Sequence, residues 1–190
     1  MDNNNIKEFF NRVAVNYTHE DSRFIDDLLD SLMVTRCHRI LDLGCGKGII
    51  SEKLATRNNG EVVALDLSSE MLKYAKEKIN DDRVKFVNAD FYEYDDEPFD
   101  AIVCFDAFPH FMDVEGYVNK ANQLLKEDGL LAIIHDIGRE ELNTHHKQHA
   151  LGVSRPLSSP EEEMKPFLKY FKPIELSETD TYYKLIMVKR

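Results

Sequence analysis

The chain contains 190 residues, of which 43% are hydrophobic and 31% are charged, and its formal net charge is −11. This length and composition predict one globular domain with a core of its own. An acidic surface repels phosphate backbones and no apolar run approaches the ~20 residues of a membrane span, so we expect neither a nucleic-acid nor a membrane partner.

The N-terminal part of the chain predicts two helices, over residues 6–17 and 22–34. In the second of them, apolar residues recur at helical spacing, so that Ile25, Leu28 and Leu29 share one face. This pattern is typical of a helix that packs one side against a larger body.

Residues 39–136 alternate between short apolar runs and amphipathic stretches. The apolar runs predict strands over 39–43, 61–67, 84–90, 99–105 and 130–136, and the stretches between them predict helices over 47–57, 68–79 and 114–126. Because the strands show little polar alternation, we expect a parallel sheet that is covered on both faces.

The C-terminal part departs from this alternation. Ser159 and Glu162 form a capping-box pattern around Pro160 and predict a helix over 158–171 that is kinked or broken at Pro166. Two further strands, over 172–180 and 181–190, are joined by a tight turn and are therefore antiparallel. The predicted fold class is α/β: a doubly wound, mostly parallel seven-stranded Rossmann-like sheet with a C-terminal antiparallel hairpin.

Three glycines, Gly44, Gly46 and Gly48, follow the first predicted strand in the run "ILDLGCGKGI". Glycine permits a positive φ and a close approach of the backbone to a ligand. In an open parallel sheet, ligands bind beyond the carboxyl ends of the strands, which is where this run lies. A tight turn without a ligand is the plainer interpretation, and a ligand cradle is the one we favour.

Three acids narrow the ligand to a nucleoside cofactor. The dinucleotide fingerprint needs a glycine where this chain has Ile49, and Asp42 just before the glycines favours a cationic amine over two phosphates. Asp66, at the end of the second strand, can accept from ribose hydroxyls, and Asp90, after the third, can accept from an exocyclic amino group such as that of adenine.

At this point the chain resembles the class I S-adenosylmethionine-dependent methyltransferases of the small-molecule type. The resemblance rests on "ILDLGCGKG", "VVALDLSSEML", "VKFVNADF", "FDAIVCFDAFPHF" and "LLKEDGLLAIIHD". It implies a single methyltransferase domain over 1–190, with an N-terminal helical lid over 1–35, a cofactor-binding core over 36–136, and substrate-side helices and the hairpin over 137–190. The implied cofactor is S-adenosyl-L-methionine.

The resemblance also implies roles at the methionine end of that cofactor. The backbone at Gly44 and Gly46 is expected to lie along the methionine part, and Asp42 to reach its ammonium group. Cys104 is expected to pass beneath the sulfonium, and Tyr17 to close over this end from the first helix.

At the adenosine end, the resemblance assigns the remaining cofactor residues. Asp66 is expected to hold the ribose diol, while Leu67 and Met71 flank the adenine. Asp90 is expected to accept from the adenine amino group, and Phe91 to pack on the ring.

The catalytic candidates are polar residues that follow the fourth and fifth strands, namely Asp106, His110 and His135. A base is needed only if the methyl acceptor must lose a proton, and each histidine is about as often a packing residue as a base. His145 and His149 share one face if their segment is helical, which suits an acceptor pocket or a metal, although a solvated face is the plainer interpretation and we assign no metal ligand.

The sequence therefore predicts methyl transfer to a small-molecule acceptor by in-line displacement. The alternatives are a non-catalytic S-adenosylmethionine-binding or metal-handling protein and, less favoured, an NAD(P)-dependent oxidoreductase. The three cysteines show no CxxC spacing, so we expect a reducing, cytoplasmic location. The sequence gives no oligomeric state.

Overall fold

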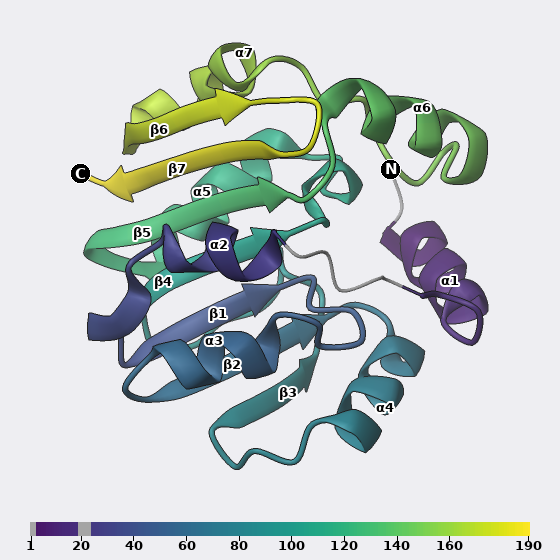
Figure 1. Ribbon diagram of the computed structural model, residues 1–190, viewed down its shortest axis with the longest axis horizontal. Helices are drawn as coiled ribbons and strands as arrows, with labels where there is room; N and C mark the ends of the chain where they lie inside the picture. The colour runs from purple at the N-terminus through teal and green to yellow at the C-terminus, as the bar shows by residue number, and fades with distance from the viewer. Residues whose placement is uncertain (1–2, 19–23) are drawn as a thin grey trace.

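The computed structural model describes residues 3–18 and 24–190. In this part of the chain one seven-stranded sheet forms, in the order β3-β2-β1-β4-β5-β7-β6 (Figure 1). The strands are β1 (Arg39–Leu43), β2 (Glu61–Asp66), β3 (Val84–Asn88), β4 (Phe99–Phe105), β5 (Leu125–His135), β6 (Phe171–Glu178) and β7 (Tyr183–Lys189). The first five strands are parallel to one another, and β7 runs antiparallel between β5 and β6. The predicted fold class is confirmed.

Helices cover both faces of the sheet. They are α1 (Asn3–Val13), α2 (Ile25–Asp30), α3 (Ser51–Arg57), α4 (Ser69–Lys78), α5 (Val114–Leu124), α6 (Arg139–His149) and α7 (Pro160–Met164), with the short 3₁₀ helices η1 (Val34–Arg36), η2 (Phe108–His110) and η3 (Lys165–Lys169). Side chains alternate between the faces, so Leu41 and Leu43 enter the core that includes α5, whereas Ile40 packs with α2 and α3.

The strand order places a switch point between β1 and β4. The chain builds β1, β2 and β3 outward and then returns to set β4 on the other side of β1. Two loops therefore diverge beyond the carboxyl ends of these two strands and leave a crevice. Figure 1 shows α1 and α6 beyond the same ends of the strands.

Several predicted element boundaries were wrong. The helix expected over 22–34 is only α2 followed by η1, and residues 22 and 23 lie outside the described part. The helix expected from residue 47 begins at Ser51, because the three glycines of positive φ hold the preceding residues in turns. The C-terminal helix changes from α7 to η3 just before Pro166, as the proline predicts.

No helix in residues 3–18 and 24–190 is long and apolar enough to cross a membrane.

A buried ion pair fixes the segment between α6 and the hairpin. The Arg155 guanidinium donates from Nη1 and Nη2 to the two carboxylate oxygens of Glu163, at 2.8 and 3.0 Å. The Glu163 side chain is 6% exposed, and it also accepts from the Ser158 N–H. The same guanidinium lies 4.6 Å from the centroid of the Phe108 ring, so the pair also packs against η2.

We predict that Glu163→Ala lowers the free energy of unfolding by about 3–5 kcal/mol, because it leaves the Arg155 charge buried without its partner. The neighbouring change Glu162→Ala is the control. Glu162 forms an exposed pair with Lys165, so its loss is expected to cost less than about 1 kcal/mol. Urea denaturation of the three proteins measures both effects, and equal losses would contradict the distinction.

Candidate functional site

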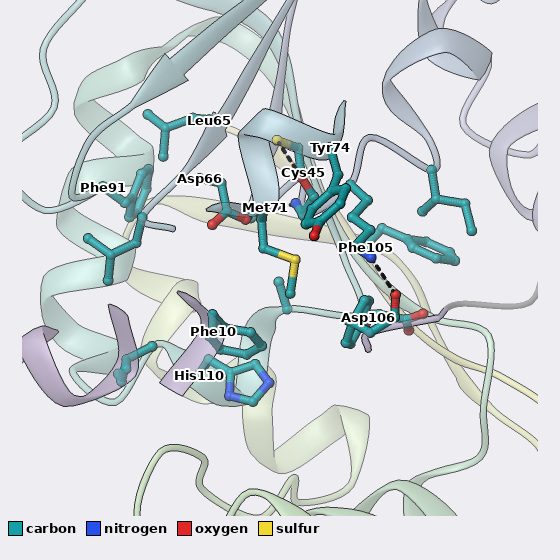
Figure 2. Close-up of a pocket in the computed structure, with 18 of the residues that line it drawn as sticks. Phe10, Cys45, Leu65, Asp66, Met71, Tyr74, Phe91, Phe105, Asp106 and His110 are labelled. Atoms are coloured by element: carbon teal, nitrogen blue, oxygen red, sulfur yellow. Dashed lines mark hydrogen bonds between the residues drawn. The ribbon is translucent and has the colours of Figure 1, made fainter. Parts of the chain in front are cut away.

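A cavity of about 530 Å³ lies beyond the carboxyl ends of β1, β2 and β4. This volume falls in the usual range of small-molecule and cofactor pockets, ~300–1,000 Å³. Figure 2 shows Asp66 and Phe91 on one side of it and Phe105 and Asp106 on the other, with Phe10 and His110 close to each other. The cavity lining therefore comes from segments far apart in the sequence.

The glycine loop forms one wall, and its three glycines are present for different reasons. All three have positive φ, of 73°, 54° and 76° in order. A Cβ on Gly44 would lie 2.6 Å from the Ala107 Cβ, and one on Gly48 would lie 2.5 Å from the Ile79 Cδ1. A Cβ on Gly46 would meet nothing within 4 Å. Protein packing accounts for Gly44 and Gly48, whereas Gly46 leaves open space for a ligand against the cavity wall.

Asp66 connects this loop to the end of β2. Its Oδ2 accepts from the Gly46 N–H at 2.8 Å, and its Oδ1 accepts from the Ser68 N–H at 2.7 Å. Burial raises the pKa of Asp66 to about 6, against the effect of these two N–H donors, which favour the charged form. The carboxylate is therefore mostly ionised at neutral pH, and it lines the cavity.

Asp42 lies behind the glycine loop and is not part of the cavity lining. It is 1% exposed, and its Oδ2 accepts from the Ser51 hydroxyl at 2.6 Å. Burial raises its pKa to about 7, although the Ser51 hydrogen bond favours the charged form. The structure thus gives Asp42 a place beneath the loop, with α3, and no direct reach into the cavity.

The adenosine end of the cavity holds the predicted residues together. Leu67, Met71, Asp90 and Phe91 all line it. Asp90 Oδ1 accepts from the Tyr92 N–H at 3.0 Å, and its Oδ2 accepts from the Asn3 side-chain amide at 2.6 Å. The second contact comes from α1, which sequence reasoning did not place near Asp90.

Tyr17, which is predicted to close over the methionine end of the cofactor, lines the cavity beside the glycine loop. Lys47, within the loop, donates to the Tyr17 carbonyl at 2.7 Å and lies 4.3 Å from the centroid of the Tyr74 ring. Burial raises the pKa of Tyr17 to about 12, and the charges of Asp106, Asp66 and Asp136 act in the same direction. The Tyr17 hydroxyl therefore stays protonated at neutral pH.

At the far end of the cavity, Asp106 and His110 are part of the lining. Asp106 has φ of 51°, a left-handed conformation that is uncommon for aspartate and found at functional sites. Its Oδ1 accepts from the Asp136 N–H and lies 3.2 Å from the Nδ1 of His135. His135 itself is fully buried and does not line the cavity, so it contacts Asp106 from behind.

His110 stands between two other rings. Its ring centroid lies 4.8 Å from that of Phe10 on α1 and 5.0 Å from that of His146 on α6. Its Nδ1 is 2.8 Å from the Val153 carbonyl oxygen, which can only accept, so Nδ1 carries the hydrogen and Nε2 carries the lone pair. Burial lowers the pKa of His110 to about 4, and that of His146 also to about 4.

His146 is the main residue that sequence reasoning missed. The stretch containing it is helical, and His145 and His149 lie on an exposed face with ring centroids 4.8 Å apart. His146 instead faces inward, in register with Leu142 and Ala150, which are also buried. The i, i+4 spacing of these three residues was the available signal. Within the described chain, no three His, Cys, Asp or Glu side chains are grouped to hold a metal ion.

Cys104 also differs from its expected place. It is fully buried in the core and is not part of the cavity lining, whereas the next residue, Phe105, is. Strand alternation explains this, because Cys104 points with Ile102 into the core on the α5 side. Of the cofactor residues predicted from the sequence, Asp42 and Cys104 lie outside the lining, and the other eight belong to it.

The fold and the cavity define an α/β protein with a pocket of cofactor size at its switch point, and known proteins resemble it in sequence and fold. Residues 41–133 match the family model described as a methyltransferase domain. The chain is 32% identical over 139 residues to a malonyl-[acyl-carrier protein] O-methyltransferase of Acetivibrio thermocellus, covering 70% of this chain and 49% of that protein. It is 37% identical over 101 residues to a ubiquinone biosynthesis O-methyltransferase of Xylella fastidiosa (strain 9a5c), covering 50% and 40%.

Among solved structures, the magnesium protoporphyrin IX methyltransferase of Synechocystis PCC 6803 superposes with a TM-score of 0.73 at 17% identity, covering the whole of both chains. At that identity the likeness concerns the fold. The chain spans about half the length of the curated relatives that it matches. The chain belongs to the class I S-adenosylmethionine-dependent methyltransferase family.

We predict that Asp42→Asn changes the pH dependence of stability. Because the folded-state pKa of about 7 exceeds the ordinary 3.8, the folded protein binds one more proton than the unfolded chain between these values. The wild-type free energy of unfolding therefore falls as pH rises through this window, by about 1.4 kcal/mol per unit from this group. Relative to wild type, the variant is expected to gain about 2–3 kcal/mol between pH 5 and pH 7.

Urea denaturation at several pH values measures this gain. Asp82→Asn, at an exposed position, is the control and is expected to follow the wild type at every pH. A difference between Asp42→Asn and wild type that stays constant across pH would contradict a buried, ionisable Asp42.

Proposed function

We propose that the protein binds S-adenosyl-L-methionine, the cofactor of its family, and transfers the methyl group to a small-molecule acceptor. The observation that carries the proposal is the convergence of the open glycine loop at Gly46 with the carboxylates of Asp66 and Asp90 on one cavity. When bound, the cofactor supplies a methyl group activated by the positive sulfonium. The protein itself has to bind the cofactor and the acceptor, orient them toward each other and exclude water.

The adenosine end suits the two carboxylates. Each Asp66 oxygen accepts one backbone N–H, and a carboxylate oxygen has a second lone pair with which to accept from a ribose hydroxyl. Asp90 is placed to accept from the adenine amino group, with Leu67, Met71 and Phe91 as apolar neighbours of the ring. The fit favours a nucleoside over a dinucleotide, since Ile49 replaces the third glycine of the dinucleotide fingerprint.

At the methionine end, the backbone at Gly44 and Gly46 would lie along the amino acid part and Tyr17 would cover it. Asp42 acts on this end from beneath the loop, where a nearby ammonium would favour its ionised form. Cys104 lies in the core on the α5 side, and the next residue, Phe105, forms the cavity surface at the end of β4.

His110 is the catalytic base that we propose for an acceptor that must lose a proton. Its Nδ1 is held by the Val153 carbonyl, so its Nε2 lone pair is the one that can take a proton. Its low pKa keeps the ring neutral, and therefore able to accept, at neutral pH. Asp106 is placed at the same end to orient the acceptor, and His135 is a positioning residue that contacts Asp106.

The acceptor class rests on the cavity volume of about 530 Å³, which is in the range of small-molecule pockets, and on the net charge of −11, which disfavours nucleic acid. The decisive experiment is isothermal calorimetry with S-adenosylhomocysteine, S-adenosylmethionine and NADH. It is followed by turnover to S-adenosylhomocysteine with a panel of phenols, thiols, amines, carboxylates and metalloid ions. Binding of NADH without binding of either adenosyl compound would overturn the proposal, and binding without turnover on any acceptor would favour a non-catalytic binding protein.

We predict that Asp66→Ala weakens S-adenosylhomocysteine binding by about 1–3 kcal/mol, because it removes a charged acceptor of hydrogen bonds. Glu70→Ala, an exposed change in the first turn of α4, is the control and is expected to bind as the wild type does. Circular dichroism confirms that the variants fold. Unchanged affinity in a folded Asp66→Ala would argue against this placement of the ribose.

We predict that His110→Ala lowers turnover on a hydroxyl or amine acceptor by about 10²–10⁴-fold, the usual contribution of a general base. The affinity for S-adenosylhomocysteine is expected to stay within about threefold of wild type, since His110 acts on the acceptor. His145→Ala, on the exposed face of α6, is the control for loss of a histidine. Loss of cofactor binding in His110→Ala would place His110 at the other end of the cavity.

A further inference from the structure

The first helix covers the cavity and is held at both of its ends. At its N-terminal end, Asn3 donates to Asp90 Oδ2 at 2.6 Å. At its C-terminal end, the Asn11 amide oxygen accepts from the Ser68 hydroxyl at 2.7 Å. Asn3, Ile6 and Phe10 all line the cavity.

Apolar contacts also hold α1 against the rest of the protein. Ile6 packs in a small cluster of its own with Ala150 and Val153, which follow α6. Phe9, Phe10, Leu67 and Met112 are partly buried against the same cluster. The helix therefore bridges the loop after β2 to the segment after α6, and three of its residues form part of the cavity wall.

The Asn3 contact uses the carboxylate oxygen that an adenine would need. Asp90 Oδ1 accepts from the backbone N–H of Tyr92, whereas Oδ2 accepts from Asn3, which lines the cavity, so Oδ2 is the oxygen for which Asn3 and a cavity ligand would compete. The side-chain amide of asparagine and the exocyclic amine of adenine are both neutral NH₂ groups, and each offers an N–H to a carboxylate. Asn3 thus occupies, from within the chain, the position of the amino group that we assign to Asp90.

We propose that Asn3 is an internal competitor for the adenine-binding carboxylate, so that cofactor binding releases the N-terminal end of α1. This inference rests on the proposed function. Because the adenine amino group replaces the bond that Asn3 gives up, the exchange costs little, and the docking of this end and the binding of adenine oppose each other reciprocally. The other end of the lid stays attached, since Lys47 holds the Tyr17 carbonyl to the glycine loop.

The test is calorimetry with S-adenosylhomocysteine on wild type, Asn3→Ala and Asn5→Ala. Asn5 lies on the same turn of α1 and is exposed, so its replacement controls for the change in helix propensity. We expect Asn3→Ala to bind roughly tenfold to 150-fold more tightly than wild type, the range for removing one competing hydrogen bond to a charged group, and Asn5→Ala to bind as wild type.

A second ligand separates competition at Asp90 from a general loosening of the lid. The S-adenosylhomocysteine analogue with hydrogen in place of the 6-amino group cannot donate to Asp90, so the gain of Asn3→Ala is expected to vanish with it. Equal or weaker binding of S-adenosylhomocysteine by Asn3→Ala, or an equal gain with both ligands, would overturn the inference alone. If neither wild type nor variant binds S-adenosylhomocysteine, the proposed function fails and this inference with it.

Discussion

The site depends on the carboxylate of Asp66 and its two backbone N–H donors. One oxygen fixes the glycine loop after β1 through Gly46, and the other fixes the start of α4 through Ser68. Burial opposes the charge on this group, which is why its pKa rises to about 6 instead of staying near 4. A single ionised side chain therefore holds two cavity walls in place. Because the two N–H donors use only part of its capacity to accept hydrogen bonds, it can also accept from a ligand without disturbing those walls.

The geometry of a parallel sheet explains why the residues grouped at this part of the cavity could be predicted from the sequence. Strand ends in a parallel sheet meet at one edge, so Asp66 and Asp90 had to come together once β2 and β3 were identified. Strand geometry also accounts for the two predicted residues that lie outside the cavity lining. Asp42 shares a face with Ile40 and points toward α3, and Cys104 shares a face with Ile102 and points toward α5, so neither reaches the cavity. The two-residue period of a strand already contained that information.

The glycine run illustrates what a sequence pattern alone cannot separate. Gly44 and Gly48 are required by neighbours that lie far along the chain, Ala107 and Ile79, whose positions no local rule gives. Gly44 and Gly46 both line the cavity, but of the three glycines only Gly46 has open space where a Cβ would lie. The same residue type thus serves packing at two positions and ligand access at one, and the three become distinguishable only when the tertiary contacts are known.

The acceptor end was harder to predict because its residues come from helices. Helices do not pair in the sheet, so strand register does not fix their positions relative to one another. Phe10, His110 and His146 come from α1, η2 and α6, and the contacts among their rings are all long-range. The family match ends at residue 133, before His146, and begins at residue 41, after α1. Similarity to known methyltransferases therefore covers the half of the cavity that the cofactor would fill. At the acceptor end, α1 and α6 lie outside the matched residues, whereas Asp106 and His110 lie within them. The residues that would select the acceptor therefore come from both sides of that boundary.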